Sequence, residues 1–235
     1  MNKNFFRFFF YFAFGFLLFL NGDAFGQRTF PVNGVANEKH IYYAFTNAKI
    51  YTDYKSSVDS ATLVIRDGII EGIGKNISVP KEAVVYDLKG KYIYPSFIDM
   101  YSDYGMPEVK RAQPNPDGSP QFLSNFKGAY NWNQAIKPEV NSVSLFFNDE
   151  KKADEMRKLG FGSVLTHQKD GIVRGTGVFV LLSDEKENKS VLKDRASAHY
   201  SFEKGSSSQD YPSSLMGAIA LLRQTYYDAQ WYKNV

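Results

Sequence analysis

The 235-residue sequence predicts a mixed α/β protein in two parts. Short strand-forming segments with closely spaced turns fill residues 41–94, which is typical of a small β-sandwich or barrel. A strand–helix–strand pattern follows between residues 140 and 166, and a long amphipathic helix covers residues 215–232. Together these patterns predict a β domain followed by an α/β domain.

The first 26 residues have the layout of a secretory signal peptide. A basic head precedes the apolar run Phe8–Leu20, and Ala24 and Gly26 are the small residues that a signal peptidase reads. The run has 13 residues, too few to span a bilayer core, which takes about 20. We therefore predict cleavage before Gln27 and export to the periplasm or the medium. The alternatives are a membrane anchor or a buried helix; no later stretch is apolar enough to span a membrane.

Residues 27–40 are polar and predict a flexible lead-in, after which five strand segments follow. These segments are rich in Ile, Val, Tyr and Thr, the residues that favour strands. They are Ile41–Thr52, Ala61–Arg66, Ile69–Ile73, Ala83–Leu88 and Lys91–Tyr94. The dipeptide Asp67-Gly68 separates two of them and favours a type I′ hairpin turn, which needs positive φ at both central residues. Leu63 and Ile65 are expected to point into the core.

The pattern changes after Pro95. Phe97–Met100 is a short apolar run that fits a buried strand. Residues 102–138 then carry many prolines and glycines and show little periodicity. Such a long irregular segment is either a solvent-exposed loop, which we expect here, or a binding loop.

A crossover unit is predicted next. Val140–Phe147 alternates apolar and polar residues like a strand, and Ser163–Thr166 forms a second strand. Between them, Glu150–Leu159 predicts a helix that Asn148 or Asp149 can cap. A strand, a helix and a strand in this order indicate a parallel crossover.

Two longer elements follow the crossover. Ile172–Leu182 is a β-branched strand segment interrupted by Gly175 and Gly177. These glycines lack the Lys-Ser/Thr pair of a phosphate loop and open no helix, so they predict a kink or bulge. Leu215–Tyr232 is the most regular helix of the sequence, and its apolar stripe is expected in the core rather than in a partner groove. The stripe comprises Leu215, Ile219, Leu222, Tyr226 and Ala229.

Composition excludes several classes of function. The sequence has no cysteine, so it forms no disulfide, thiolate metal site or cysteine nucleophile. A net charge of +3 gives no nucleic-acid footprint. With three histidines, a histidine-rich metal centre is almost excluded. The motifs of serine hydrolases, zinc proteases and calcium loops are absent from the sequence.

Three segments resemble the amidohydrolase superfamily. Ala44–Thr52 (AFTNAKIYT) looks like its opening strand, and Val64–Gly74 (VIRDGIIEGIG) looks like the hairpin that follows. Val85–Asp99 (VYDLKGKYIYPSFID) is closer still to the family pattern. The resemblance is specific over residues 44–105. It is looser over residues 138–232, which look like the imidazolonepropionase-like branch.

The resemblance implies a two-part fold. A small β-sandwich would occupy residues 41–96. The first part of a metal-dependent (β/α)8 TIM-like barrel would occupy residues 97–235, with the barrel incomplete in this chain. Active members of the family use a divalent metal such as zinc.

The metal motif of the family is replaced in this sequence. The resemblance implies a His-x-His pair directly after Phe-Ile-Asp, where both imidazoles hold the catalytic metal. Here the run is Tyr101-Ser102-Asp103. A tyrosine phenol with a pKa near 10 is a poor substitute for imidazole, and one carboxylate is one ligand of the three or four that zinc needs. We therefore assign no catalytic, cofactor-binding or metal-binding residue, and expect no cofactor in this chain.

His167 is the histidine whose position in the predicted fold suggests a functional role. His167 closes a predicted strand, and in a barrel the carboxyl ends of the strands face the active site. The alternative, which is commoner for a lone histidine at a strand end, is a satisfied surface residue. His40 and His199 carry no site signal.

Two functional hypotheses follow. The leading one is an exported amidohydrolase-like protein of which this chain is an N-terminal portion, inactive alone because 139 residues from Phe97 onwards fall short of the roughly 250 of a full barrel. By resemblance, the protein would hydrolyse carbon–nitrogen bonds other than peptide bonds, in a small amide or cyclic amide, if completed by further sequence. The rival is a non-catalytic binding or scaffolding module derived from the same fold.

Overall fold

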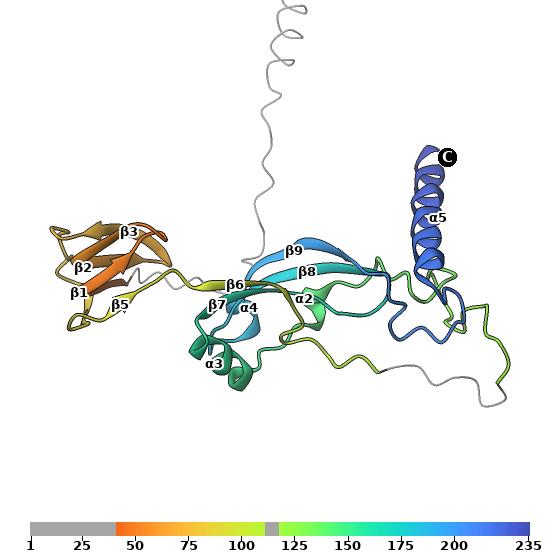
Figure 1. Cartoon of the computed structure of the whole chain (residues 1–235), viewed down its shortest axis with the longest axis horizontal. Helices are drawn as coiled ribbons and strands as arrows, with labels where there is room; N and C mark the ends of the chain where they lie inside the picture. The colour runs from red at the N-terminus through yellow and green to blue at the C-terminus, as the bar shows by residue number, and fades with distance from the viewer. Residues whose placement is uncertain (1–40, 111–117) are drawn as a thin grey trace, which may run out of the picture. The chain divides into compact units, whose positions relative to one another are not determined.

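The computed structural model describes residues 41–110 and 118–235 (Figure 1). The predicted signal peptide, the lead-in over residues 27–40 and His40 lie outside the described residues. Within the described ranges, no helix is both long and apolar enough to cross a membrane.

The first five strands form one mixed sheet. They are β1 (Tyr42–Tyr51), β2 (Ser57–Arg66), β3 (Ile69–Gly74), β4 (Val84–Asp87) and β5 (Tyr92–Ile93). The order is β3-β2-β1-β4, with β5 also beside β1. β2 runs antiparallel to both β1 and β3, whereas β4 and β5 run parallel to β1. All five predicted strand segments of this region are therefore confirmed.

The hairpin between β2 and β3 has the predicted turn. Asp67 has φ 50° and Gly68 has φ 76°, the left-handed pair that a type I′ turn requires. Leu63 is buried with Ile50 in the core of this sheet, and Ile65 packs against the same cluster. The predicted inward direction of Leu63 and Ile65 is confirmed.

A second mixed sheet follows, with the order β6-β7-β8-β9. Its strands are β6 (Phe97–Ser102), β7 (Phe161–Thr166), β8 (Val173–Leu181) and β9 (Val191–Tyr200). β6 and β7 are parallel, and the remaining pairs are antiparallel. The pairing of β8 and β9 is irregular around Gly175 and Gly177, which confirms the predicted bulge.

The predicted strand over Val140–Phe147 is wrong. The structure places the short helix α2 (Ser142–Leu145) there. A single helical turn puts Val143 and Phe146, three residues apart, against the same core, so the apolar spacing fits a turn as well as a strand. The parallel crossover therefore connects β6 to β7 through α3 (Glu150–Lys158).

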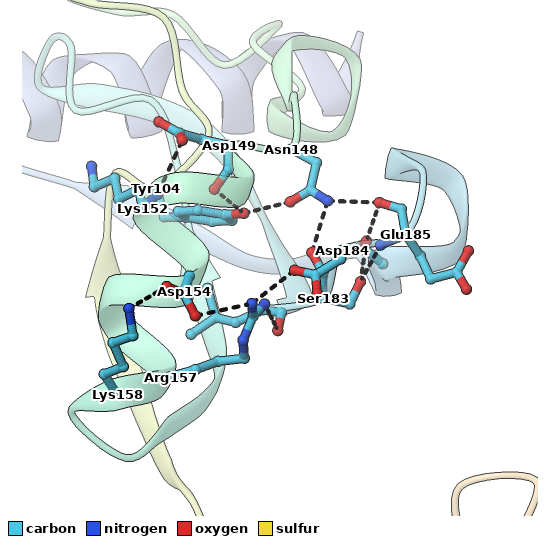
Figure 2. Close-up of polar contacts among 12 residues, drawn as sticks. Tyr104, Asn148, Asp149, Lys152, Asp154, Arg157, Lys158, Ser183, Asp184 and Glu185 are labelled. Atoms are coloured by element: carbon cyan, nitrogen blue, oxygen red, sulfur yellow. Dashed lines mark hydrogen bonds and ion pairs between the residues drawn. The ribbon is translucent and has the colours of Figure 1, made fainter.

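A polar network holds α3 against the second sheet (Figure 2). The Asp149 side chain caps α3 by accepting from the Lys152 amide, as predicted for that position. Buried Tyr104 donates its hydroxyl to Asn148 Oδ1. Asn148 in turn donates to the carbonyls of Ser183 and Glu185, in the turn that precedes the short helix α4 (Glu187–Ser190). Three segments far apart in sequence are thus joined around one tyrosine.

Buried amide side chains pin the described part of the long irregular segment. The Gln134 backbone N–H donates to the Gln209 side-chain oxygen Oε1 at 2.7 Å. Gln209 Nε2 donates to the carbonyls of Phe122 and Trp132. Most of residues 118–132 are exposed, as expected for a solvent-exposed loop, whereas residues 133–136 are buried. The buried glutamines satisfy backbone groups of this segment in place of water.

The last helix, α5 (Leu215–Asn234), confirms the predicted helix but not its predicted core stripe. Ala218 and Leu221 are buried against Ile136 and Ile172, with Leu222 partly buried beside them. The stripe residues Leu215, Ile219 and Tyr226 are exposed. The buried residues of the helix lie in its first turns, and further along Tyr226 donates its hydroxyl to Tyr200 Oη at 3.1 Å.

Candidate functional site

Two histidines from separate strands meet over β8. His167 directly follows β7, and His199 lies on β9. Gly177 of β8 leaves space for the His199 ring, because a Cβ at this position would stand 2.5 Å from His199 Nε2. A glycine inside a strand is thus explained by the close approach of another group.

The two imidazoles are stacked face to face. Their ring centroids are 3.6 Å apart and their planes are inclined by 1°. His199 Nε2 shares a hydrogen bond of 2.6 Å with Ser197 Oγ. His167 is fully buried, and in the described part of the chain neither of its ring nitrogens has a hydrogen-bond partner.

Tyr101 joins this pair from β6. Its ring centroid lies 5.0 Å from that of His167. The Arg174 guanidinium on β8 donates from Nη1 to Tyr101 Oη at 2.8 Å and from Nε to the Gly171 carbonyl at 3.0 Å. Lys169 Nζ lies 4.6 Å from the centroid of the Tyr101 ring. The site therefore combines an aromatic wall with two permanent cations.

Asp103 lies at the edge of this cluster. Its carboxylate is exposed and is 3.8 Å from Lys152 Nζ and 3.9 Å from Lys169 Nζ. Distances of this length at an exposed site give weak, solvent-screened attraction. Ser102, between the two motif positions, is buried and accepts from the Tyr104 amide, so its role is structural.

The local electrostatics keep both histidines neutral at pH 7. Burial, reinforced by His199 and by the charges of Arg174 and Lys169, lowers the pKa of His167 to about 3. Burial and Arg174 also lower the pKa of His199. Within the described ranges, no carboxylate forms an ion pair with Arg174. Arg174 therefore carries a positive charge that no carboxylate of the described residues pairs, whereas Lys169 faces Asp103 at 3.9 Å.

These residues do not fit a divalent metal. The described residues contain no group of three or more His, Asp or Glu that could hold one. The lone pairs of an imidazole lie in its ring plane, and two parallel planes do not aim them at a common point. The phenol oxygen of Tyr101 already accepts from a guanidinium, which repels a cation at that position.

Sequence reasoning identified part of this cluster. The sequence alone assigns no site residue: Tyr101 and Asp103 stand as replacements of a metal motif, and His167 as a candidate at a strand end. The structure brings Tyr101 and His167 together and leaves Asp103 at the rim. Arg174 and His199 were missed. The glycine interruption of β8 was the available signal, since a glycine inside a strand indicates close approach of another group.

Comparison with known proteins gives partial matches. No family model matches the chain. A dihydroorotase of Caldanaerobacter subterraneus subsp. tengcongensis is 45% identical over 49 residues, which are 21% of this chain and 11% of that protein. The crystal structure of an amidohydrolase from Thermotoga maritima matches with a TM-score of 0.60 and 23% identity, over 82% of this chain. A second amidohydrolase structure matches 26% of the chain with 28% identity, and its TM-score of 0.24 is too low to indicate a common fold.

The match to the Thermotoga structure defines the fold. The chain spans 48% of that amidohydrolase, so it corresponds to about half of the neighbour's length. The dihydroorotase match covers only a short segment of either protein. The described part of the chain, with its two mixed sheets, therefore has the hydrolase-like fold of an amidohydrolase.

Proposed function

We propose that this chain is an exported part of an amidohydrolase-superfamily protein of the imidazolonepropionase-like branch. In this proposal the strands of residues 41–96 form the family's small β-sandwich. β6 is the first strand of its (β/α)8 barrel, and residues 97–235 are the first part of that barrel. The parallel pairing of β6 and β7 around α3 supports the barrel assignment of this unit, because a (β/α)8 barrel is built from such units. The antiparallel strands β8 and β9 lie outside that pattern.

We further propose that this part is a binding module rather than a metal hydrolase in its own right. One observation carries the proposal. The Arg174 guanidinium is hydrogen-bonded to Tyr101 Oη at the strand end where the family resemblance implies an imidazole ligand. A fixed guanidinium binds anions and repels metal cations, so the chemistry of the site is the reverse of that of a metal centre.

A second candidate function is hydrolysis of a carbon–nitrogen bond in a small amide or cyclic amide. The likeness to a dihydroorotase and the 48% coverage of the Thermotoga amidohydrolase favour it. In this candidate the metal ligands and the general base come from residues outside this chain.

Elemental analysis and a hydrolysis screen on the purified chain distinguish the two candidates. We expect far less than one zinc per chain and no hydrolysis of dihydroorotate or simple cyclic amides. The double variant Tyr101→His, Asp103→His is expected to remain inactive, because Arg174 still occupies the site. Tyr130→His, at an exposed tyrosine, controls for adventitious zinc binding by a new histidine. One tightly bound zinc per wild-type chain, lost in the Asp103→Asn or His167→Gln variant, would overturn the binding-module proposal.

A further inference from the structure

We propose that Tyr101, His167, Lys169, Arg174 and His199 form a binding site for an oxyanion, the carboxylate or phosphate group of a small molecule. This inference rests on the proposed binding function and names the chemical class of its ligand.

The unpaired charge of Arg174 is the first argument. Its side chain is 5% exposed, yet in the described residues no carboxylate stands within ion-pair distance. Removing a charge from water is costly, and buried charges in proteins are as a rule paired. Lys169 and two neutral histidines surround this guanidinium, so no neighbour in the cluster offsets its charge. A bound anion supplies the missing counter-charge.

The guanidinium is also held in a fixed orientation. Nε donates to the Gly171 carbonyl and Nη1 donates to Tyr101 Oη, so two hydrogen bonds fix the orientation of the guanidinium plane. A guanidinium has five N–H groups in a planar fork, and these two bonds leave the other donors for a ligand. A preorganised fork of this kind suits the two oxygens of a carboxylate or phosphate.

Tyr101 and Lys169 add donors at the open side of the cluster. Tyr101 Oη accepts from Arg174, so its own hydroxyl proton is available for an anion. Lys169 Nζ is 3.9 Å from the Asp103 carboxylate, too far for a hydrogen bond. Tyr101 is 54% exposed, so these groups can be reached from solvent.

His167 gives the independent argument. It is fully buried, and neither ring nitrogen has a described hydrogen-bond partner. A neutral imidazole has one N–H donor, and leaving a buried donor unsatisfied costs about 1–3 kcal/mol. An anion bound at the edge of the His167 ring, beside the Tyr101 hydroxyl, would accept that proton. The donors of Tyr101, His167, Lys169 and Arg174 thus share one requirement, an acceptor that carries negative charge.

The surroundings leave room for more than a simple ion. Lys169 also lines a cavity of about 1150 Å³, together with Lys204, Ser207 and Ser208. The ligand's anionic group would bind at Arg174, and the remainder of the molecule would extend into this cavity.

Calorimetric titration of the wild-type chain tests the proposal. The probes are inorganic phosphate and succinate, each titrated at constant ionic strength with chloride as the reference anion. We expect saturable binding of at least one probe; the better one identifies the source as phosphate or carboxylate. Arg174→Met should weaken binding about 10- to 100-fold, the range of a hydrogen bond to a charged group. Arg223→Met removes the same charge from an exposed position of α5 and should leave binding unchanged.

Two outcomes would overturn the proposal. One is an absence of saturable binding by either probe. The other is equal affinity in the wild-type and Arg174→Met chains. If Arg174→Met does not fold, Tyr101→Phe and Lys169→Met take its place, and each must weaken binding. Zinc analysis of the same preparation separates the two proposals: bound zinc overturns the binding-module function, whereas only the anion titration decides this site.

Discussion

Tyr104→Phe isolates the contribution of one buried hydroxyl to stability. Tyr104 is fully buried, its hydroxyl donates to Asn148 Oδ1, and its ring packs 6.0 Å from that of Phe146. Burial raises the pKa of the phenol, so the hydroxyl stays protonated and donates throughout the neutral range. Phenylalanine keeps the ring contact and removes only the hydroxyl, which donates to Asn148 Oδ1 and also lies 3.3 Å from the Asp149 carbonyl oxygen.

The expected loss follows from the partner left behind. Asn148 Oδ1 loses its donor, while Asn148 Nδ2 keeps its bonds to Ser183 and Glu185. A lost bond of this kind costs about 1–2 kcal/mol. For a chain of this size, that corresponds to a fall in Tm of roughly 2–8 °C.

Guanidinium chloride unfolding, followed by circular dichroism and tryptophan fluorescence, measures the loss. Tyr130→Phe is the matched control, because Tyr130 is exposed and its hydroxyl makes no hydrogen bond to a described residue. Its free energy of unfolding should stay within about 0.5 kcal/mol of the wild-type value. If Tyr104→Phe changes stability no more than Tyr130→Phe does, the network around Asn148 does not stabilise the fold as argued.

Three further predictions concern the hairpin, the buried histidine and the leader. Gly68→Val should cost about 1–2 kcal/mol in chemical unfolding through backbone strain alone, because no atom lies within 4 Å of its Cβ position; Gly68→Asn should be tolerated. His167 has a pKa of about 3 when folded and 6.5 when unfolded, so the unfolded state binds more protons between these values. The free energy of unfolding should therefore fall as pH drops below 6.5, by up to about 1.4 kcal/mol per pH unit, and by less in His167→Gln. Mass spectrometry of the exported protein should show Gln27 as its first residue, and a full-length mass would contradict cleavage.

Local signals predicted the first sheet well. The dipeptide Asp67-Gly68 favours the positive φ angles of a type I′ turn by its residue types alone. The strands on either side of it are indicated by their apolar alternation. Val140–Phe147 failed because Val143 and Phe146 satisfy both a strand-like alternation and a single helical turn. Only the packing of that turn against the second sheet decides between the two.

The candidate site could be predicted only in part, for a related reason. Tyr101 and His167 stand at strand ends, which marks them in the sequence. Arg174 and His199 reach them through the antiparallel pairing of β8 with β9, which joins residues as far apart as Val173 and Tyr200 in a register that shifts at several points. Local sequence patterns do not specify such a register.

The hydrogen bonds of Asn148 span long stretches of chain. The bond from Tyr104 spans 44 residues, and the bond to the Ser183 carbonyl spans 35. Closing loops of this length costs chain entropy before either bond can form, so contacts of this kind are made late in folding. Interactions absent from the folding transition state slow unfolding rather than speed folding. We therefore expect loss of the Tyr104–Asn148 hydrogen bond to speed unfolding of the second sheet more than it slows folding.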